Sequence, residues 1–396
     1  MSETLREIPF SLLAAAAVLV AGSALGQPPA AVVAEPESLT SRVPPWPVGP
    51  FLLLRGGGVI AGQLRELTAD RLVVETVSLG RLELLRAAVA GYRSSPRSGP
   101  RSLAAADSPV SMRLANGDRL AAGTVTCDGR RLSLAGLAGM PAAGESLKIP
   151  LERVLAIDLP PEQAALGAEQ PFAGATGIRW VALEDGTRLP CRQVAVDEGG
   201  AATGRVSLTP AGAGLPTPLA CPAAEVAVFE TDGAGLRLAG LGPTRCDAPD
   251  CWPLAIGQSV TGDWPRLRGL TGFTAIGLHA PAVVRYVFDR PVTRFTAVVG
   301  IDDSAGQGGS VTVRVAAGSG LPAGAGRGPA GRPATQRGGE VLAEVFRSPV
   351  LRGGDSPLVI DLPLVDATSL ELQLEPADGS TVLDRTLWLD PQVWFE

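Results

Sequence analysis

The residues best suited to a binding chemistry lie in the last third of the chain. Asp302 and Asp303 directly follow the apolar residues Val298–Ile301. Paired carboxylates at the end of a strand offer hard oxygen ligands, which suit either a calcium ion or the hydroxyl groups of a sugar. A turn in which each aspartate accepts hydrogen bonds from nearby backbone amides explains the pair equally well. Both interpretations stay open at this point.

His279 and Trp388 are the other candidates for contact with a carbohydrate. His279 is the only histidine, so the chain cannot build a metal site from several histidines. Its imidazole can hydrogen-bond a ligand or serve a purely structural role. Trp388 offers an aromatic face to a sugar ring, although a tryptophan within a strand usually belongs to the core.

No catalytic signature accompanies these residues. The sequence contains no Gly-x-Ser-x-Gly nucleophile turn, no Gly-x-x-x-x-Gly-Lys phosphate loop and no His-Glu-x-x-His zinc motif. The two carboxylates of a glycosidase follow no fixed spacing, so a hidden glycoside-active site is not excluded by pattern. We expect a non-catalytic protein.

The segments that must position these residues have the pattern of β-strands. From Pro253 onward, short apolar or alternating runs are separated by turn residues at the spacing of an antiparallel β-sandwich. These runs are Val283–Phe288, Arg294–Gly300, Ser310–Ala316, Leu358–Leu362 and Ser369–Leu374. We therefore predict an all-β domain over residues 254–396.

This part of the chain resembles the NPCBM family of carbohydrate-binding modules. The resemblance is carried, in order, by Gly277–Pro281 with Tyr286, by Val299–Asp303, by Gly309–Val315 and by Asp384–Pro391. It implies a galactose-binding-like jelly roll that binds carbohydrate through His279, Asp302, Asp303 and Trp388. It also implies a structural calcium at Asp302 and Asp303. The Gly-rich and Ala-rich insertion 318–339 departs from the family, and we expect a flexible surface loop there.

The region before the sandwich repeats one pattern three times. Leu54, Leu114 and Leu183 are each followed by a glycine at the third position and by an apolar residue at the sixth. Asn-Gly and Asp-Gly between alternating apolar residues are strong hairpin signals, because both central residues of a type I′ turn need positive φ. We expect β repeats at residues 51–93, 110–159 and 178–231.

Each repeat also has a matching second half. Leu82, Leu147 and Leu219 are followed at the seventh position by valine and at the tenth by Tyr92, Ile157 and Phe229. Four or five short strands in so few residues favour a small closed barrel, since closure removes exposed edges. The order resembles SH3-like or Sm-like barrels, and the repeated apolar positions are expected to form their cores.

Composition and charge narrow the choice of partner. The chain has 396 residues with a net charge of −6, and Lys148 is its only lysine. An acidic chain without a lysine-rich tract argues against nucleic acid as a partner. No later segment is apolar over 18 residues, so we expect no membrane span after signal cleavage.

The N-terminal residues indicate export. Residues 1–26 have the apolar run and the small −3 and −1 residues of a signal peptide, and residues 27–50 form a proline-rich linker. Five cysteines fit a secreted, periplasmic or cell-surface protein. Cys246 with Cys251, and Cys191 with Cys221, are the spacings that a disulfide could close, although free buried cysteines are an equal alternative.

Two functional interpretations follow. In the first, an exported non-catalytic protein recognises carbohydrate or a glycosylated surface with its C-terminal sandwich, while the β repeats space it or dock it onto a protein partner. In the second, the sandwich has lost sugar binding, and the chain is a structural or assembly protein built on protein–protein contacts.

Overall fold

The computed structural model describes most of the chain as β-structure. The described residues are 43–55, 57–95, 110–137, 146–160, 177–196, 204–212, 214–231, 235–318 and 342–395. Within these ranges all regular elements are strands or single turns of 3-10 helix. This confirms the all-β fold class. No helix in the described ranges is both long and apolar enough to span a membrane.

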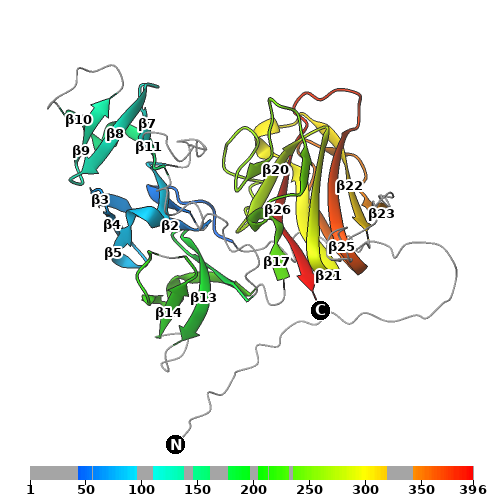
Figure 1. The fold of residues 1–396 in the computed structure, drawn as a ribbon, viewed down its shortest axis with the longest axis horizontal. Helices are drawn as coiled ribbons and strands as arrows, with labels where there is room; N and C mark the ends of the chain where they lie inside the picture. Colours follow the sequence, from blue (N-terminus) through cyan, green and yellow to red (C-terminus); the bar gives the residue numbers. More distant parts are fainter. Residues whose placement is uncertain are drawn as a thin grey trace, which may run out of the picture. The chain divides into compact units, whose positions relative to one another are not determined.

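The strands before residue 232 are described in three groups, which are distinguished by colour in Figure 1; within the described ranges group 1 has six strands, and groups 2 and 3 have five each. Group 1 contains β1 (Phe51–Leu54), β2 (Val59–Ala61), β3 (Gln63–Leu67), β4 (Arg71–Thr76), β5 (Gly80–Leu85) and β6 (Val89–Arg93). Group 2 contains β7 (Val110–Leu114), β8 (Arg119–Cys127), β9 (Arg131–Leu137), β10 (Leu147–Pro150) and β11 (Val154–Asp158). Group 3 contains β12 (Arg179–Leu183), β13 (Arg188–Val196), β14 (Arg205–Pro210), β15 (Leu219–Pro222) and β16 (Val226–Thr231).

The repeated glycines sit in the first hairpin of each group. Gly57, Gly117 and Gly186 have φ values of 88°, 90° and 88°. An L-residue with a side chain rarely adopts this conformation, so the tight turns between β1 and β2, β7 and β8, and β12 and β13 need glycine there. The closure of each group into an SH3-like or Sm-like barrel stays a prediction.

The last strands of groups 1 and 2 pair with each other. β6 and β11 are antiparallel, with Tyr92 opposite Ile157, which occupy the same position in their repeats. Arg93 and Asp158 form a buried ion pair across this ladder. An apolar cluster with members from all three groups lies behind these strands.

The residues from 235 onward form antiparallel sheets of the sandwich type. Their main strands are β20 (Ala275–His279), β21 (Ala282–Ile301), β22 (Ser310–Gly318), β23 (Leu342–Arg347), β25 (Leu358–Pro376) and β26 (Arg385–Phe395). Shorter strands flank them, namely β17 (Gly235–Arg237), β18 (Arg245–Asp247), β19 (Ala255–Ile256) and β24 (Leu351–Arg352).

Two long strands serve both sheets of the sandwich. The first half of β21 pairs with the second half of β25, which also pairs with β22. The second half of β21 pairs with β26, which in turn pairs with β20. The ladder is irregular between Val287 and Arg294, where β21 passes from one sheet to the other. The ends of β20, β21 and β26 are thereby fixed next to one another.

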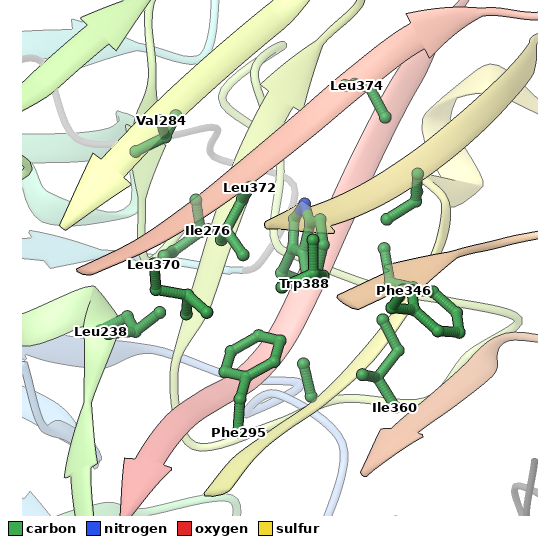
Figure 2. Packing of buried hydrophobic residues seen from close by; sticks show 14 of the residues in the cluster. Leu238, Ile276, Val284, Phe295, Phe346, Ile360, Leu370, Leu372, Leu374 and Trp388 are labelled. Carbon is green, nitrogen blue, oxygen red and sulfur yellow. The ribbon is translucent and has the colours of Figure 1, made fainter. Parts of the chain in front are cut away.

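The sandwich core contains the largest apolar side chains of this region. Trp388, Phe295 and Leu372 have 0% of their surface exposed, and Figure 2 shows Trp388 in the middle of the cluster, among Phe295, Ile276 and Leu372. The rings of Phe295 and Trp388 lie 6.3 Å apart. Such packing makes the sandwich a firm support for the loops at its ends.

Several sequence predictions fall outside the described residues. The signal peptide at 1–26, the first part of the linker at 27–50 and almost all of the insertion 318–339 are among them. All five cysteines are free thiols; Cys127, Cys191 and Cys221 are buried, whereas Cys246 and Cys251 are exposed. The structure therefore contains neither of the disulfides considered from spacing.

Candidate functional site

One end of the sandwich brings together most of the residues selected from the sequence. His279 closes β20 and pairs in register with Arg385 at the start of β26. Asp302 and Asp303 directly follow β21, whose last residue, Ile301, pairs with Thr386. Because neighbouring antiparallel strands begin and end at the same edge, these side chains share one end of the fold.

Asp302 acts as a buried cap. Only 2% of its surface is exposed, and its Oδ1 accepts a hydrogen bond of 2.8 Å from the backbone N–H of Ser304. Its Oδ2 accepts a hydrogen bond from the hydroxyl of Ser259. Burial raises the pKa of Asp302, and the hydrogen bonds from Ser259 and Ser304 oppose that rise. The Asp302 carboxylate therefore orders the turn after β21.

Asp303 is exposed and binds a different loop. Its Oδ2 accepts a hydrogen bond of 2.9 Å from the backbone N–H of Gly269, and its Oδ1 accepts one from the N–H of Arg268. Arg268 has a φ of 49°, which is uncommon for a residue with a side chain. The carboxylate thus fixes the loop at residues 266–270 against the turn after β21.

The arrangement around Asp302 and Asp303 does not fit a calcium ion. All four carboxylate oxygens face N–H or O–H hydrogens, whereas calcium requires six to eight oxygen ligands around one point. No group of three or more His, Cys, Asp or Glu side chains in the described ranges could hold a metal ion. Calcium elsewhere in the sandwich stays a prediction from the resemblance.

His279 belongs to an aromatic and cationic cluster. Its ring stacks on that of Trp252, with centroids 5.2 Å apart and an interplanar angle of 4°. The guanidinium carbon of Arg385 lies 5.3 Å from the centroid of the Trp252 ring. His279 is buried, while Trp252 and Arg385 are half-buried. The Nδ1 atom of His279 lies 2.8 Å from the carbonyl oxygen of Ala280, so this ring nitrogen is engaged within the chain.

Asp384 adds a carboxylate to this cluster. Its Oδ1 accepts a 2.7 Å hydrogen bond from the backbone N–H of Ser310, but its buried Oδ2 has no hydrogen-bond partner within the described ranges. The Nε atom of Arg385 is also buried and has no hydrogen-bond partner within the described ranges. Burial raises the pKa of Asp384, and the nearby His279 opposes that rise. Unpaired buried polar groups are uncommon in folded proteins.

Trp388 does not reach this cluster. Its side chain is fully buried in the core, so a sugar ring could stack on it only after the core had been unpacked. This placement favours the core interpretation of Trp388 and corrects the sugar-stacking one. The half-buried Trp394 lies elsewhere on β26, and its Nε1 donates to the hydroxyl of Thr296.

Trp252 is the aromatic residue that sequence reasoning missed. It lies in the loop between β18 and β19, directly after Cys251, where no alternation marks an element. One signal in the sequence could have identified Trp252. It is an aromatic residue among turn residues, outside any predicted strand that would bury it in the core. Arg385 and Asp384 lay inside a segment already singled out, and their roles follow only from the pairing of β26 with β20.

The sandwich thus gathers Trp252, His279, Asp384 and Arg385 at one end. Residues 247–394 match the model of the NPCBM/NEW2 domain. This part of the chain is therefore an NPCBM domain. No curated relative matches the chain by sequence.

Among solved structures, several carbohydrate-binding modules are similar. One is CBM51 from Clostridium perfringens GH95 in complex with methyl-galactose, with 17% identity over 40% of this chain and 99% of that chain, and a TM-score of 0.32. Another holds the tandem CBM51 modules of Sp3GH98 from Streptococcus pneumoniae, with 11% identity over 94% of this chain and 97% of that chain, and a TM-score of 0.32. These values are too low to transfer a ligand or a site to this chain.

Proposed function

We propose that the NPCBM domain binds carbohydrate at the cluster of Trp252, His279, Asp384 and Arg385. The observation that carries this proposal is the stack of Trp252 on His279 beside Arg385, next to an unpartnered carboxylate oxygen of Asp384. The match of residues 247–394 to the NPCBM/NEW2 domain supports the same class of ligand.

The cluster has the groups that a sugar requires. The aromatic ring of Trp252 offers a surface to the C–H groups of a pyranose. The half-buried Arg385 can donate hydrogen bonds to hydroxyl or ring oxygens of the sugar, and the buried carboxylate of Asp384 precedes it in the chain. Because these groups surround a small area, each site is expected to bind weakly and to gain strength when several copies engage one surface.

We further propose that the protein is exported and non-catalytic. The apolar N-terminal run supports export, and the absence of catalytic motifs from the sequence supports a binding role. In this proposal the three strand groups space the domain or dock it onto a protein partner.

Binding of the purified full chain to a glycan array, followed by titration of the best ligand, tests the proposal. Trp252→Ala is expected to weaken binding about tenfold, which corresponds to about 1.4 kcal/mol and to the loss of one aromatic contact. Trp394→Ala is the matched control, since it removes another half-buried tryptophan from the same sandwich. Equal binding by wild type and Trp252→Ala, with both folded, contradicts the proposed site.

A further inference from the structure

The arginines of the sandwich differ in whether they have an acidic partner. Away from the cluster end, most of them form ion pairs with carboxylates. These arginines are Arg237, Arg245, Arg285, Arg294, Arg314 and Arg347. Their charge is compensated within the domain, so they leave little attraction for an anion from outside.

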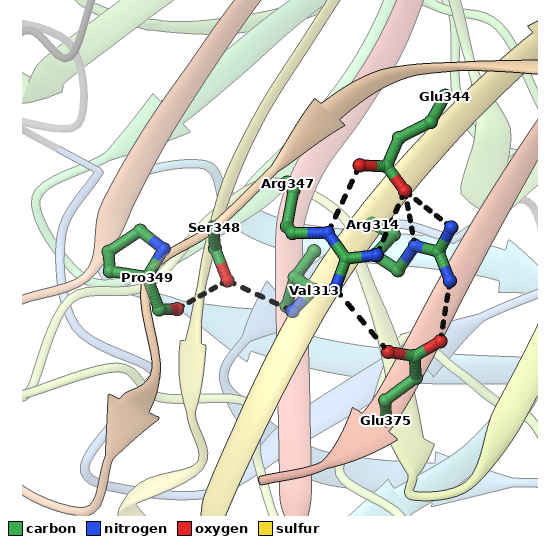
Figure 3. A network of polar contacts seen from close by, with 7 residues as sticks. All are labelled: Val313, Arg314, Glu344, Arg347, Ser348, Pro349 and Glu375. Atoms are coloured by element: carbon green, nitrogen blue, oxygen red, sulfur yellow. Dashed lines mark hydrogen bonds and ion pairs between the residues drawn. The ribbon is translucent and has the colours of Figure 1, made fainter.

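The network on β22, β23 and β25 illustrates this compensation. Arg314 donates to Glu375 at 2.7 Å and also pairs with Glu344, while Arg347 lies 3.0 Å from Glu344. Figure 3 shows the two guanidinium groups held between the two glutamates. All the charges of this network are therefore paired with an opposite charge from the same sheet.

Four arginines at the cluster end have no such carboxylate partner within the described ranges. They are Arg266, Arg268, Arg352 and Arg385; the first three are exposed and Arg385 is half-buried. The guanidinium of Arg268 donates to the hydroxyl of Ser356 at 3.0 Å, and that of Arg385 lies 3.4 Å from the hydroxyl and the carbonyl of Ser304. The side-chain partners of Arg268 and Arg385 are therefore neutral oxygens.

The backbones of these four arginines border one loop, residues 302–310. Asp303 N–H donates to the carbonyl of Arg266, and Asp302 N–H donates to the carbonyl of Arg385. Arg268 N–H donates to the Asp303 carboxylate. Arg352 pairs in register with Ser310 at the other end of the loop. The same loop reaches the proposed sugar site through Arg385, which lies beside Trp252.

The carboxylates near this loop are engaged by other groups. Asp303 accepts two backbone N–H groups, and Asp355 accepts the backbone N–H of Arg352 at 2.8 Å. Asp302 and Asp384 are buried, and burial raises the pKa of each. These carboxylates are occupied as hydrogen-bond acceptors, whereas the four guanidinium groups keep N–H donors that form no ion pair within the described ranges.

We propose that the ligand of this domain is an acidic carbohydrate, whose carboxylate or sulfate groups bind Arg266, Arg268, Arg352 and Arg385 around the loop 302–310. This inference rests on the proposed carbohydrate-binding function and names its substrate class. A guanidinium group binds a planar carboxylate or a sulfate through two parallel hydrogen bonds, which are stronger than those between neutral groups. The neutral part of the sugar contacts Trp252.

Two pairs of polysaccharides that differ only in charge test this inference with the full chain. The first pair is polygalacturonate and its fully methyl-esterified form, and the second is carrageenan and the same polymer after desulfation. Affinity electrophoresis and calorimetry are expected to show that the protein binds the charged member of one pair at least about tenfold more tightly than the neutral member. Added salt is expected to weaken binding to the charged member, because it screens the charges. The pair that responds distinguishes a carboxylate ligand from a sulfate ligand.

A triple variant, Arg266→Gln with Arg268→Gln and Arg352→Gln, identifies the surface. It removes three exposed charges without touching Trp252 or Arg385, and it is expected to abolish the preference for the charged polymer. The matched control is Arg314→Gln with Arg347→Gln, which removes paired charges elsewhere on the sandwich and is expected to keep the preference. Circular dichroism and the melting temperature confirm that both variants fold.

The outcomes separate this inference from the proposed function. Equal binding to charged and neutral members, with loss in Trp252→Ala, overturns the acidic ligand and leaves carbohydrate binding intact. If both arginine variants lose the preference for the charged polymer, the binding is a general attraction to polyanions. This outcome also overturns the acidic-ligand inference. No binding to any glycan by the folded protein contradicts the inference and the proposed function together.

Discussion

At the scale of single residues, burial decides which aromatic side chains can meet a ligand. Trp388 and Trp252 belong to the same domain, but the first has 0% of its surface exposed and the second is half-buried beside His279. Substitution of Trp388 should therefore lower stability, whereas substitution of Trp252 should weaken ligand binding.

Replacement of Trp388 by alanine tests this difference. We expect Trp388→Ala to lower the free energy of unfolding by about 3–5 kcal/mol, because it leaves a cavity in the centre of the core. Urea unfolding followed by fluorescence measures the loss. Trp252→Ala is expected to unfold within about 1 kcal/mol of wild type, since its ring is half-buried at a loop. A stable Trp388→Ala protein that no longer binds sugar would show that Trp388 is part of the site.

At the scale of elements, the turn after β21 is held by a buried carboxylate. Asp302 accepts from Ser304 within its own turn and from Ser259 in the loop before β20. Burial raises the pKa of this group above its ordinary value of 3.8. A raised carboxyl pKa means that the folded state holds the proton more tightly than the unfolded state does.

The sign of the pH dependence follows from this. Below pH 3.8 the Asp302 carboxyl is protonated in both states, and as pH rises from that value toward the raised pKa its contribution to stability is lost. The loss is about 1.4 kcal/mol for each pH unit between the two pKa values. We expect Asp302→Asn, which keeps an acceptor for Ser304, to gain stability relative to wild type as pH rises through this window.

Melting temperatures of both proteins between pH 3 and pH 7 check the expectation. Asp361→Asn serves as a control, because Asp361 lies on the same domain and pairs with Arg294 at the surface. A difference between wild type and Asp302→Asn that stays constant over this range would contradict a raised pKa at Asp302.

At the scale of the whole molecule, strand groups 1 and 2 are connected by a β-ladder as well as by the polypeptide between them. The ladder of β6 with β11 contains Arg93, with 0% of its surface exposed, and Asp158, with 5% exposed. Arg93 also donates to the carbonyls of Tyr92 and Ile157, so one side chain spans both strands. Buried ion pairs add little net stability, but a broken pair leaves an uncompensated charge.

Substitution of Asp158 by alanine should therefore destabilise the paired groups. We expect a loss of about 3–5 kcal/mol, because Arg93 would remain buried without its carboxylate. Calorimetric unfolding of the full chain measures this as a lower melting temperature of one transition. The double variant Arg93→Met with Asp158→Leu removes both charges and is expected to lose less. An equal loss in both variants would assign the effect to packing rather than to charge.

Local pattern accounts for much of what the structure shows. Period-two alternation and turn glycines predicted the all-β class, the antiparallel sandwich strands and the three hairpins around Gly57, Gly117 and Gly186. The flanking strands β17 and β18 pair with this sandwich but precede its predicted start at residue 254. These features depend on residues close together in the chain, because the pleat and the φ angle of a turn are local properties. His279, Asp302 and Asp384 lie in the segments that carry the resemblance to the NPCBM family.

The composition of the candidate site depended on tertiary structure. Pairing of β20 with β26 places Arg385 opposite His279, more than a hundred positions apart in sequence, and the loop before β19 brings Trp252 onto the imidazole. Burial removed Trp388 from the site, and backbone N–H groups engaged Asp303. Which arginines lack an acidic partner also emerged only there, since ion pairing depends on distances in space, which spacing along the chain does not determine.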